Sequence, residues 1–483
     1  MNYVNGQFCY FRQNFSSKNP SDGTIIDWFP QSTKEEIQYT VYCARTAFLE
    51  WKKLSRIQRA EHIDRLCELV KERKELLARA ISTETGKTIN ESRAEVIESL
   101  HMAQYTFGMA RMPNGEVIPS ELADRDSYVI RKPKGVVAII SPWNFPFAIG
   151  GFWCALPALL EGNTVVFKPS EDTPQVGVEI AKLFHDAGFL PGTFNLLQGD
   201  GDVGNNLIED DVDHICFTGS VEVGKHIRAA CAKSDHKTCS CEMGAKSAVI
   251  VFDEPGNLNL GVAAALNSAF KLSGQRCVSS GRILIQRSLY KEFCAEFVSC
   301  AKLLKVGPWT EDDSFIGPLI NQSQFDRVAE FNKMVNEDSH CTVLLKGKKV
   351  GTKGYFLSPH VYQCEWADKP YLKKEVFGPH VALIPFDDID DAIGIFNDTD
   401  YGLSVGVITK DFMKMRKCKL ELDAGMIYFN LGSIGAESHL PFSGVKKSGY
   451  GGGSAAETFN VVVNKVSVTV NHSDKLNFPQ GLK

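Results

Sequence analysis

A strong net charge of either sign is missing from this chain. Its 483 residues carry a formal net charge of −5, with 53 basic residues against 58 acidic ones. This near balance gives no electrostatic reason to expect nucleic acid or an anionic membrane surface as a partner. An apolar fraction of 43% and a charged fraction of 23% are typical of a soluble globular protein. The length predicts two or three domains.

Paired cysteine motifs are missing as well. The 14 cysteines do not show the repeated CxxC spacing of structural zinc sites. Cys239 and Cys241 lie two apart on a predicted strand, but no second ligand pair follows them, so we expect no metal. Residues 1–6 are polar and uncharged, and no apolar signal segment follows them. We therefore expect reduced thiols and a cytoplasmic protein.

Residues 135–160 lack charged side chains and form a stretch long enough to cross a bilayer. The stretch contains Pro142, Pro146 and Pro157 and a polar centre at residues 141–144. Its first six residues are short, apolar and partly β-branched, which is typical of a buried parallel strand. We therefore predict a strand, a loop and a buried helix, and no membrane association.

The order of the remaining segments predicts a doubly wound α/β fold. Residues 34–110 interleave charged and apolar residues as helices do, and short apolar runs then alternate with amphipathic segments. Runs at 164–167, 214–217 and 248–252 are predicted as buried strands, and a second strand–helix series spans 281–430. Ligands of such sheets collect at the carboxyl ends of the strands.

Two β-type segments, 127–131 and 460–470, lie outside this alternation. They can pair with each other or with another subunit. Pairing across subunits would cover their open edges, so we expect an oligomer.

Several motifs carry polar residues that are ambiguous when taken singly. Lys168 and Glu171 follow a predicted strand and can bracket a ribose, although an ordinary charged turn has the same composition. Gly219-Ser220 ends another strand and opens a helix, whose free N–H groups suit a pyrophosphate. The chain lacks a GxGxxG fingerprint there. Glu242 is either a chance acid in a loop or a general base.

Taken together, the motifs resemble the aldehyde dehydrogenase superfamily over nearly the whole chain. The motifs are Pro-Trp-Asn-Phe-Pro at 142–146, Lys-Pro-Ser-Glu at 168–171, the Glu242 segment, Gly-Gln-Arg-Cys at 274–277, Glu-Val-Phe-Gly-Pro at 375–379 and the segment 441–449. The resemblance implies an α/β fold with a Rossmann-like cofactor-binding domain, an α/β catalytic domain and a small β oligomerisation domain. The cofactor-binding domain is expected at 1–120 and 139–245, and the catalytic domain at 246–445. The oligomerisation strands are expected at 121–138 and 458–483.

The resemblance also implies roles for single residues. Cys277 would attack an aldehyde as a thiolate, Asn144 would stabilise the oxyanion, and Glu242 would activate water to hydrolyse the resulting thioester. The hydride would pass to NAD, with NADP as a possible substitute, because a carboxylate at Glu171 repels a 2′-phosphate. Lys168 counts among both the catalytic and the cofactor-binding residues. The other cofactor-binding residues implied are Trp143, Glu171, Gly219, Ser220, Gly224, Met243, Glu375 and Phe377.

The substrate channel is predicted to include Phe145, Ile149 and Phe152, whose spacing puts them on one helical face. Plain core packing explains the same spacing. The substrate is a small-molecule aldehyde, and a metabolic semialdehyde is plausible from the breadth of the family. Arg276 stays unassigned. An activated thiolate at Cys277 predicts faster alkylation there than at the other cysteines.

Three readings of the function remain in competition. Glu242 favours release of a free carboxylic acid over transfer of the acyl group to coenzyme A. A catalytically silent binding protein with the same fold is the third reading, although Asn144, Glu242 and Cys277 are all present. The chain departs from the family pattern at Ala245, where a glycine is common, and at the glycine-rich residues 449–453. We expect a homodimer or a homotetramer.

Overall fold

The computed structural model describes residues 1–9, 13–254, 256–478 and 480. Four long helices follow a short N-terminal segment, as the composition of residues 34–110 predicts. Three of them begin with capping boxes, in which Thr33, Ser55 and Thr88 accept a bond from the backbone N–H three residues on. The helices are α1 (Lys34–Trp51), α2 (Arg56–Glu72), α3 (Lys74–Thr85) and α4 (Ile89–Met109).

The first sheet has eight strands in the order β2-β1-β9-β8-β7-β10-β11-β22. Its central strands, β9 to β11, run parallel, while β1 and β22 pair antiparallel at the two sides. The strands are β1 (Asn2–Val4), β2 (Gln7–Cys9), β7 (Val136–Ile140), β8 (Thr164–Lys168), β9 (Phe194–Leu196), β10 (His214–Thr218), β11 (Thr238–Glu242) and β22 (Gly449–Tyr450). The helices that accompany them are α5 (Ala155–Leu160), α6 (Pro174–Asp186), α7 (Gly201–Glu209) and α8 (Val221–Ala232).

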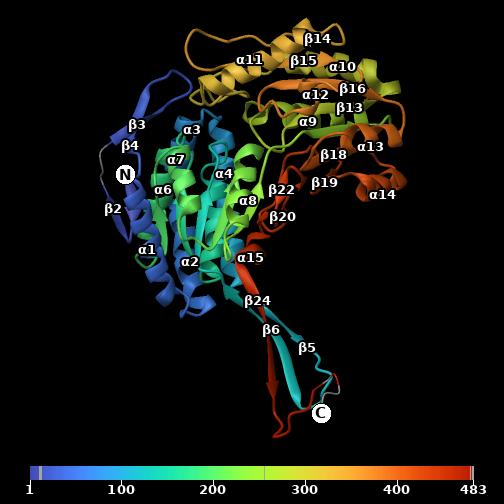
Figure 1. The fold of residues 1–483 in the computed structure, drawn as a ribbon. Coiled ribbons are helices and arrows are strands. Elements are labelled where there is room, and N and C mark those ends of the chain that lie inside the picture. The colour runs from blue at the N-terminus through green and yellow to red at the C-terminus, as the bar shows by residue number, and fades with distance from the viewer. Residues whose placement is uncertain (10–12, 255, 479, 481–483) are drawn as a thin grey trace.

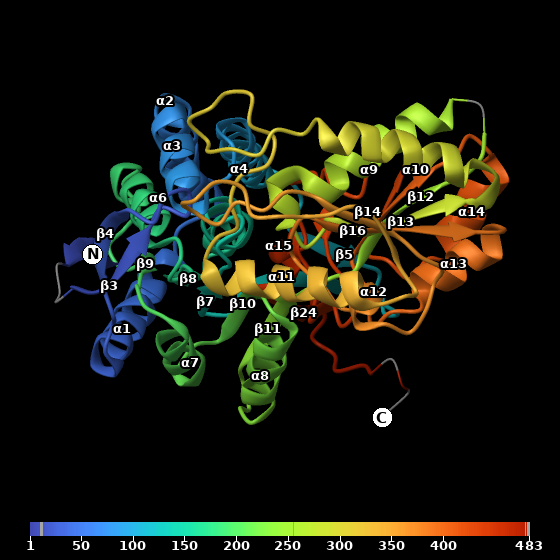
Figure 2. The same ribbon diagram turned by 90° about the horizontal axis from the view of Figure 1, so that it is seen from above.

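The second sheet has seven strands in the order β14-β15-β16-β13-β12-β18-β19, all parallel except β14. The strands are β12 (Ser247–Val251), β13 (Ser280–Gln286), β14 (Thr342–Leu345), β15 (His360–Gln363), β16 (His380–Phe386), β18 (Ser404–Ile408) and β19 (Met426–Phe429). The helices of this region are α9 (Asn257–Phe270), α10 (Arg287–Lys302), α11 (Gln322–Glu337), α12 (Pro370–Lys373), α13 (Ile389–Asn397) and α14 (Phe412–Glu421). Seen from above, the two α/β regions lie side by side (Figure 2).

A three-stranded antiparallel sheet projects away from both regions (Figure 1). In it β24 (Val463–Asn471) pairs with β6 (Arg125–Pro133), and β6 pairs with β5 (Gly115–Ile118). The two β-type segments outside the alternation therefore pair with each other. Two boundaries differ from those expected, because β5 starts before residue 121 and Val136 already belongs to β7 of the first sheet. Residues 458–461 form the short helix α15 (Thr458–Val461), so the last strand starts later than predicted.

Smaller paired strands complete the chain. They are β3 (Gln13–Lys18) with β4 (Ile25–Pro30), β17 (Tyr401–Gly402) with β21 (Val445–Lys446), and β20 (Pro441–Phe442) with β23 (Ser454–Ala455).

The charge-free stretch 135–160 is the buried strand, loop and helix that its prolines predict. β7 lies in the middle of the first sheet, and a π-helical turn, Ile149–Cys154, leads into α5. Every residue of that turn and of α5 is buried in the protein core. Among the described residues, no helix combines the length and apolar character needed to span a bilayer.

Candidate active site

A cavity of about 320 Å³ brings together residues from both α/β regions. The parallel strands β7, β10 and β11 end at one edge of the first sheet, so the segments that follow them meet there. The cavity wall contains nine residues that the sequence analysis singles out: Trp143, Asn144, Ile149, Gly219, Ser220, Met243, Cys277, Glu375 and Phe377.

Cys277 is partly buried and follows a short 3-10 turn, Lys271–Gly274. Leu272 and Ser273 have φ angles of 54° and 56°, and Gly274 has a φ of 71°. A Cβ atom at position 274 would lie 2.3 Å from the Gly378 carbonyl oxygen, so only glycine fits this close approach. The turn therefore fixes the direction in which the chain reaches Cys277.

The thiol of Cys277 is not activated in this structure. Burial, together with the negative charges of Glu375 and Glu242, raises its pKa to about 12. The raised pKa argues against preferential alkylation of this cysteine in the protein without ligands, and the alkylation itself stays a prediction. Ionisation of the thiol requires a change of its surroundings or a base that takes its proton.

Asn144 lies beside the nucleophile loop. Its side-chain amide donates a hydrogen bond of 3.0 Å to the backbone carbonyl of Gln275, two residues before Cys277. Its own backbone carbonyl accepts a bond of 2.7 Å from Lys87 Nζ. The amide is buried and reaches the neighbourhood of the thiol, as an oxyanion donor must.

Glu242 is the last residue of β11 and is buried. Its Oε2 accepts a bond of 3.1 Å from the Gly444 N–H, whereas Oε1 has no hydrogen-bond partner. Burial raises the pKa of this carboxyl well above its usual range. Glu242 does not line the cavity itself, but its negative charge contributes to the raised pKa of the Cys277 thiol.

The unusual glycine-rich segment lies directly behind Glu242. In the first sheet Gly449 pairs with Glu242 and Tyr450 pairs with Cys241. A Cβ atom on Gly451 would lie 2.1 Å from the Cys239 carbonyl oxygen. Glycine at this position lets the segment pack tightly against the strand that carries Glu242.

The part of the cavity formed by β10 and α8 fits an anionic ligand. Ser220 caps α8 by accepting a bond from the Val223 N–H, and the free N–H groups of the first turn lie at the cavity. A Cβ atom on Gly219 would lie 2.5 Å from the Phe217 ring. At Gly224 it would lie 2.4 Å from the Met243 sulfur. Gly224 thus packs beneath the cavity and does not line it.

Glu375 and Phe377 form the wall on the side of the second sheet. Glu375 Oε1 accepts a bond of 2.8 Å from the Ala245 N–H, so the unusual alanine keeps the backbone contact. A Cβ atom on Gly244 would lie 2.5 Å from Glu375 Oε2. Phe377 has a φ of 63° and meets Trp143 edge to face, with ring centroids 5.5 Å apart.

Several cavity residues have no role predicted from the sequence. Gln324 and Arg327 of α11 bond to the backbone carbonyls of Phe377 and Glu375, each over 2.7 Å. Both belong to an ordinary amphipathic helix, so no local signal distinguishes them. The remaining such residues of the wall are Pro142, Thr218, Val221, Glu222, Gly244 and Tyr401.

Two expectations need correction. Phe152 is completely buried and packs on Phe147, with ring centroids 4.7 Å apart. It lies in a π-helical turn, whose wider winding does not place it on the same face as Ile149. It belongs to the core and not to a channel. Lys168 is buried at the end of β8, where Nζ donates to the Pro169 carbonyl and lies 3.8 Å from Glu171. Lys168 does not line the cavity of Cys277, so it remains a cofactor candidate only.

Phe145 and Glu171 lie outside the wall of this cavity too. Glu171 lines a neighbouring cavity, and Phe145 packs against Lys87, whose Nζ lies 4.5 Å from the ring centroid. The described residues contain no group of three or more His, Cys, Asp or Glu side chains that could hold a metal ion.

Comparison with known proteins identifies the family. The family model described as "Aldehyde dehydrogenase family" matches residues 10–468. The chain belongs to this aldehyde dehydrogenase family. It is an NAD(P)-dependent enzyme that oxidises an aldehyde.

Individual aldehyde dehydrogenases match along almost their whole length. The alpha-ketoglutaric semialdehyde dehydrogenase of Bacillus subtilis is 32% identical over 480 residues, which cover 97% of this chain and 98% of that protein. The aldehyde dehydrogenase of Bacillus cereus superposes with a TM-score of 0.94 at 29% identity, covering 98% and 96% of the two chains. The NAD+ complex of betaine aldehyde dehydrogenase from Staphylococcus aureus has a TM-score of 0.93 at 30% identity, covering 98% and 95%. The fold is thus that of the family.

Proposed function

We propose that this aldehyde dehydrogenase releases its product as the free carboxylic acid, with Cys277 as nucleophile and Glu242 as general base. One observation carries the proposal. The cavity holds the Cys277 thiol and the Asn144 amide, while the Glu242 carboxyl behind it keeps one oxygen without a hydrogen-bond partner. That oxygen is available to accept a proton.

The reaction begins when Cys277 attacks the aldehyde carbon and its proton passes to the unpaired oxygen of Glu242, which releases it to solvent before the hydrolysis step. The high pKa of the Cys277 thiol means that attack and proton removal must be coupled. The oxygen of the resulting thiohemiacetal becomes negative, and the Asn144 amide donates a hydrogen bond to it in place of its bond to Gln275. Bound NAD supplies the acceptor for the hydride that leaves the aldehyde carbon, and this leaves a thioester on Cys277.

Water then hydrolyses the thioester and needs a base. Burial makes the Glu242 carboxylate a stronger base than an exposed one, because its raised pKa favours the protonated form. Glu242 takes a proton from the attacking water and returns it to the Cys277 sulfur as the carboxylic acid departs. An acyl transfer to coenzyme A would not need this carboxylate.

The cofactor would lie along the edge of the first sheet. Ser220 and the first turn of α8 suit the pyrophosphate, Lys168 and Glu171 the adenine ribose, and Glu375 with Phe377 the nicotinamide ribose and ring. The close packing at Gly219 and Gly224 supports this fit, since a larger residue would clash with Phe217 or Met243 and shift the segment that borders the cavity. Glu171 favours NAD over NADP because its carboxylate repels a 2′-phosphate.

A semialdehyde is the substrate class that we favour. The Bacillus subtilis relative acts, by its name, on alpha-ketoglutaric semialdehyde. Ile149 lines the cavity that holds Cys277, whereas Phe145 lies outside its wall. A separate surface cavity of about 390 Å³ between α4 and residues 436–439 forms a candidate channel mouth.

The projecting sheet of β5, β6 and β24 supports assembly into a homodimer or homotetramer. β5 and β24 are its two edge strands and have unpaired backbone groups along one side. We place the enzyme in the cytoplasm, since all 14 cysteines are free thiols.

Turnover of a panel of aldehydes tests the proposal, with NAD and NADP compared and with coenzyme A present or absent. We expect NADH and free acid from wild type without coenzyme A, and neither from Cys277→Ala. Cys300→Ala is the matched control, because that partly buried thiol lies on α10 and outside the cavity. Equal rates for wild type and Cys277→Ala would refute the nucleophile, and turnover that depends on coenzyme A would refute hydrolysis.

A further inference from the structure

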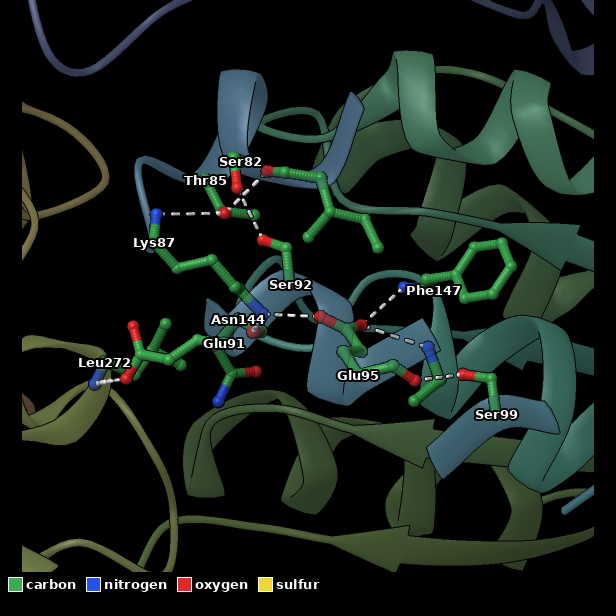
Figure 3. A network of polar contacts seen from close by, with 12 residues as sticks. Ser82, Thr85, Lys87, Glu91, Ser92, Glu95, Ser99, Asn144, Phe147 and Leu272 are labelled. Atoms are coloured by element: carbon green, nitrogen blue, oxygen red, sulfur yellow. Dashed lines mark hydrogen bonds and ion pairs between the residues drawn. The ribbon is translucent and has the colours of Figure 1, made fainter. Parts of the chain in front are cut away.

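We propose that Lys87, Glu91 and Glu95 are positioning residues, which hold the Asn144 amide and the Cys277 loop in fixed relative positions. These three residues lie at the corner between α3 and α4 and are buried. Figure 3 shows that their polar atoms point toward Asn144, Phe147 and Leu272. The inference rests on the proposed roles of Asn144 and Cys277.

Lys87 and Glu95 form one half of the arrangement. Their ion pair of 2.5 Å is almost completely buried. Lys87 Nζ also donates to the Asn144 carbonyl oxygen over 2.7 Å. Glu95 Oε1 accepts bonds from the N–H groups of Phe147 and Ala148, over 2.9 and 3.1 Å. The pair therefore binds the two ends of residues 144–148, the segment whose first residue presents the amide.

Glu91 forms the other half. Its Oε1 accepts a bond of 2.6 Å from the Leu272 N–H, five residues before Cys277. Its Oε2 accepts bonds from the N–H and hydroxyl of Thr88, which caps the same helix. The guanidinium of Arg276, next to Cys277, lies 3.8 Å from Glu91 Oε1. One helical turn thus connects the nucleophile loop to the pair that holds Asn144.

The nucleophile loop needs such a support. Left-handed backbone conformations are unfavourable for non-glycine residues such as Leu272 and Ser273. They persist only where surrounding contacts determine the backbone. Glu91 supplies a charged acceptor to the first of them, and the Ser273 hydroxyl donates to the Gly317 carbonyl over 2.8 Å.

Stability alone does not account for the Lys87–Glu95 pair. Replacement of a buried ion pair by apolar residues is often neutral or stabilising. The free energy lost when both charges leave water on folding offsets their mutual attraction. Here the other hydrogen bonds of the pair go to the backbone of residues 144–148, the segment that borders the cavity. The consequence is a fixed Asn144 backbone next to the cavity.

The test compares two buried ion pairs. The double variant Lys87→Met/Glu95→Leu removes the proposed positioning pair while keeping volume and burial. Its matched control is Arg56→Met/Glu161→Leu, which removes the pair formed by Arg56 and Glu161 over 2.6 Å, away from the cavity wall. The measurements are kcat, KM for the aldehyde, the dissociation constant of NAD, and the melting temperature.

We expect the positioning variant to lose about tenfold to hundredfold in kcat, since a misplacement of about 1 Å has that effect. The NAD dissociation constant should stay within about twofold of wild type, because α8 and the Glu375 loop are untouched. The control should keep its kcat. Equal kcat values for wild type and the positioning variant would overturn the proposal, even if stability changes.

Where the double variant does not fold, Glu95→Gln applies the same test with an isosteric side chain. Its single acceptor oxygen can serve either Lys87 Nζ or the N–H groups of Phe147 and Ala148, and its NH2 group then meets the other donor and displaces it. We expect a fall in kcat with folding retained, and an unchanged kcat would overturn the proposal. Failure of the proposed function is recognised separately, since the Cys277→Ala variant would then keep the activity of wild type.

Discussion

Two buried carboxylates near Cys277 have opposite surroundings. Glu95 accepts three hydrogen bonds, two from backbone N–H groups and one from Lys87, so both of its oxygens are satisfied. Glu242 accepts one bond from Gly444, and its second oxygen has no partner. A buried polar group without a partner costs free energy that a paired one does not. The difference separates a residue that fixes geometry from one that is free to exchange a proton.

The largest effect should follow from Glu242→Gln. We expect steady-state turnover to fall by about 10²–10⁴, the range that general base catalysis supplies. Formation of the thioester needs no activated water. A burst of NADH close to one per active site should therefore remain, provided that Cys277 can lose its proton without Glu242. Stopped-flow absorbance measures both. Full steady-state activity in the variant would contradict the role of Glu242.

The next effect concerns stability. Glu95→Ala should lower the free energy of unfolding by about 3–5 kcal/mol, because Lys87 is left as an uncompensated buried charge. Glu242→Gln should not lower it, since the wild-type carboxyl is already desolvated with one unpaired oxygen. Urea titrations of both variants give the comparison. Equal losses in the two variants would show that the two carboxyls do not differ as their hydrogen bonds indicate.

Alkylation of Cys277 should be slow near neutral pH and accelerate as the pH rises. Its pKa of about 12 means that the thiolate fraction grows tenfold per pH unit below that value. Iodoacetamide labelling followed by peptide mass spectrometry measures the rate, and Cys300 on α10 is the internal reference. A rate at Cys277 that levels off near neutral pH would show a stabilised thiolate.

A smaller effect should appear in the pH dependence of stability. Glu242 has a folded-state pKa above its ordinary value of 4.5, so the native state keeps a proton that the unfolded chain releases. Its contribution to stability is present below pH 4.5 and is lost as the pH rises toward the folded pKa. Relative to Glu242→Gln, wild type should lose up to about 1.4 kcal/mol per pH unit in that interval. A constant difference would show an unshifted pKa.

Parts of the fold and site follow from local patterns. The strands at 136–140, 164–168 and 214–218 are short apolar runs, and this composition predicts buried strands. The structure confirms them and buries nearly every residue in them. The capped helices of residues 34–109 follow from their side-chain periodicity and first residues. Five of the nine predicted residues that line the cavity follow the parallel strands β7, β10 and β11, namely Trp143, Asn144, Gly219, Ser220 and Met243.

Other features depend on contacts between distant segments. Phe152 has the spacing of a channel residue, but the π-helical turn directs it into the core. Gln324 and Arg327 lie on a helix whose sequence does not indicate that it borders the cavity. The pairing of Gly449 with Glu242 joins positions more than two hundred residues apart. No local propensity contains such information.

The sequence by itself determined the family, the α/β class and the identity of the chemical groups, because these depend on residue type and order. The tertiary structure decided the state of those groups. Burial and nearby carboxylates raise the pKa of the Cys277 thiol, and Glu242 differs from Glu95 in its hydrogen-bond and ion-pair partners. Reactivity depends on solvation and on neighbours, and both arise when the chain folds.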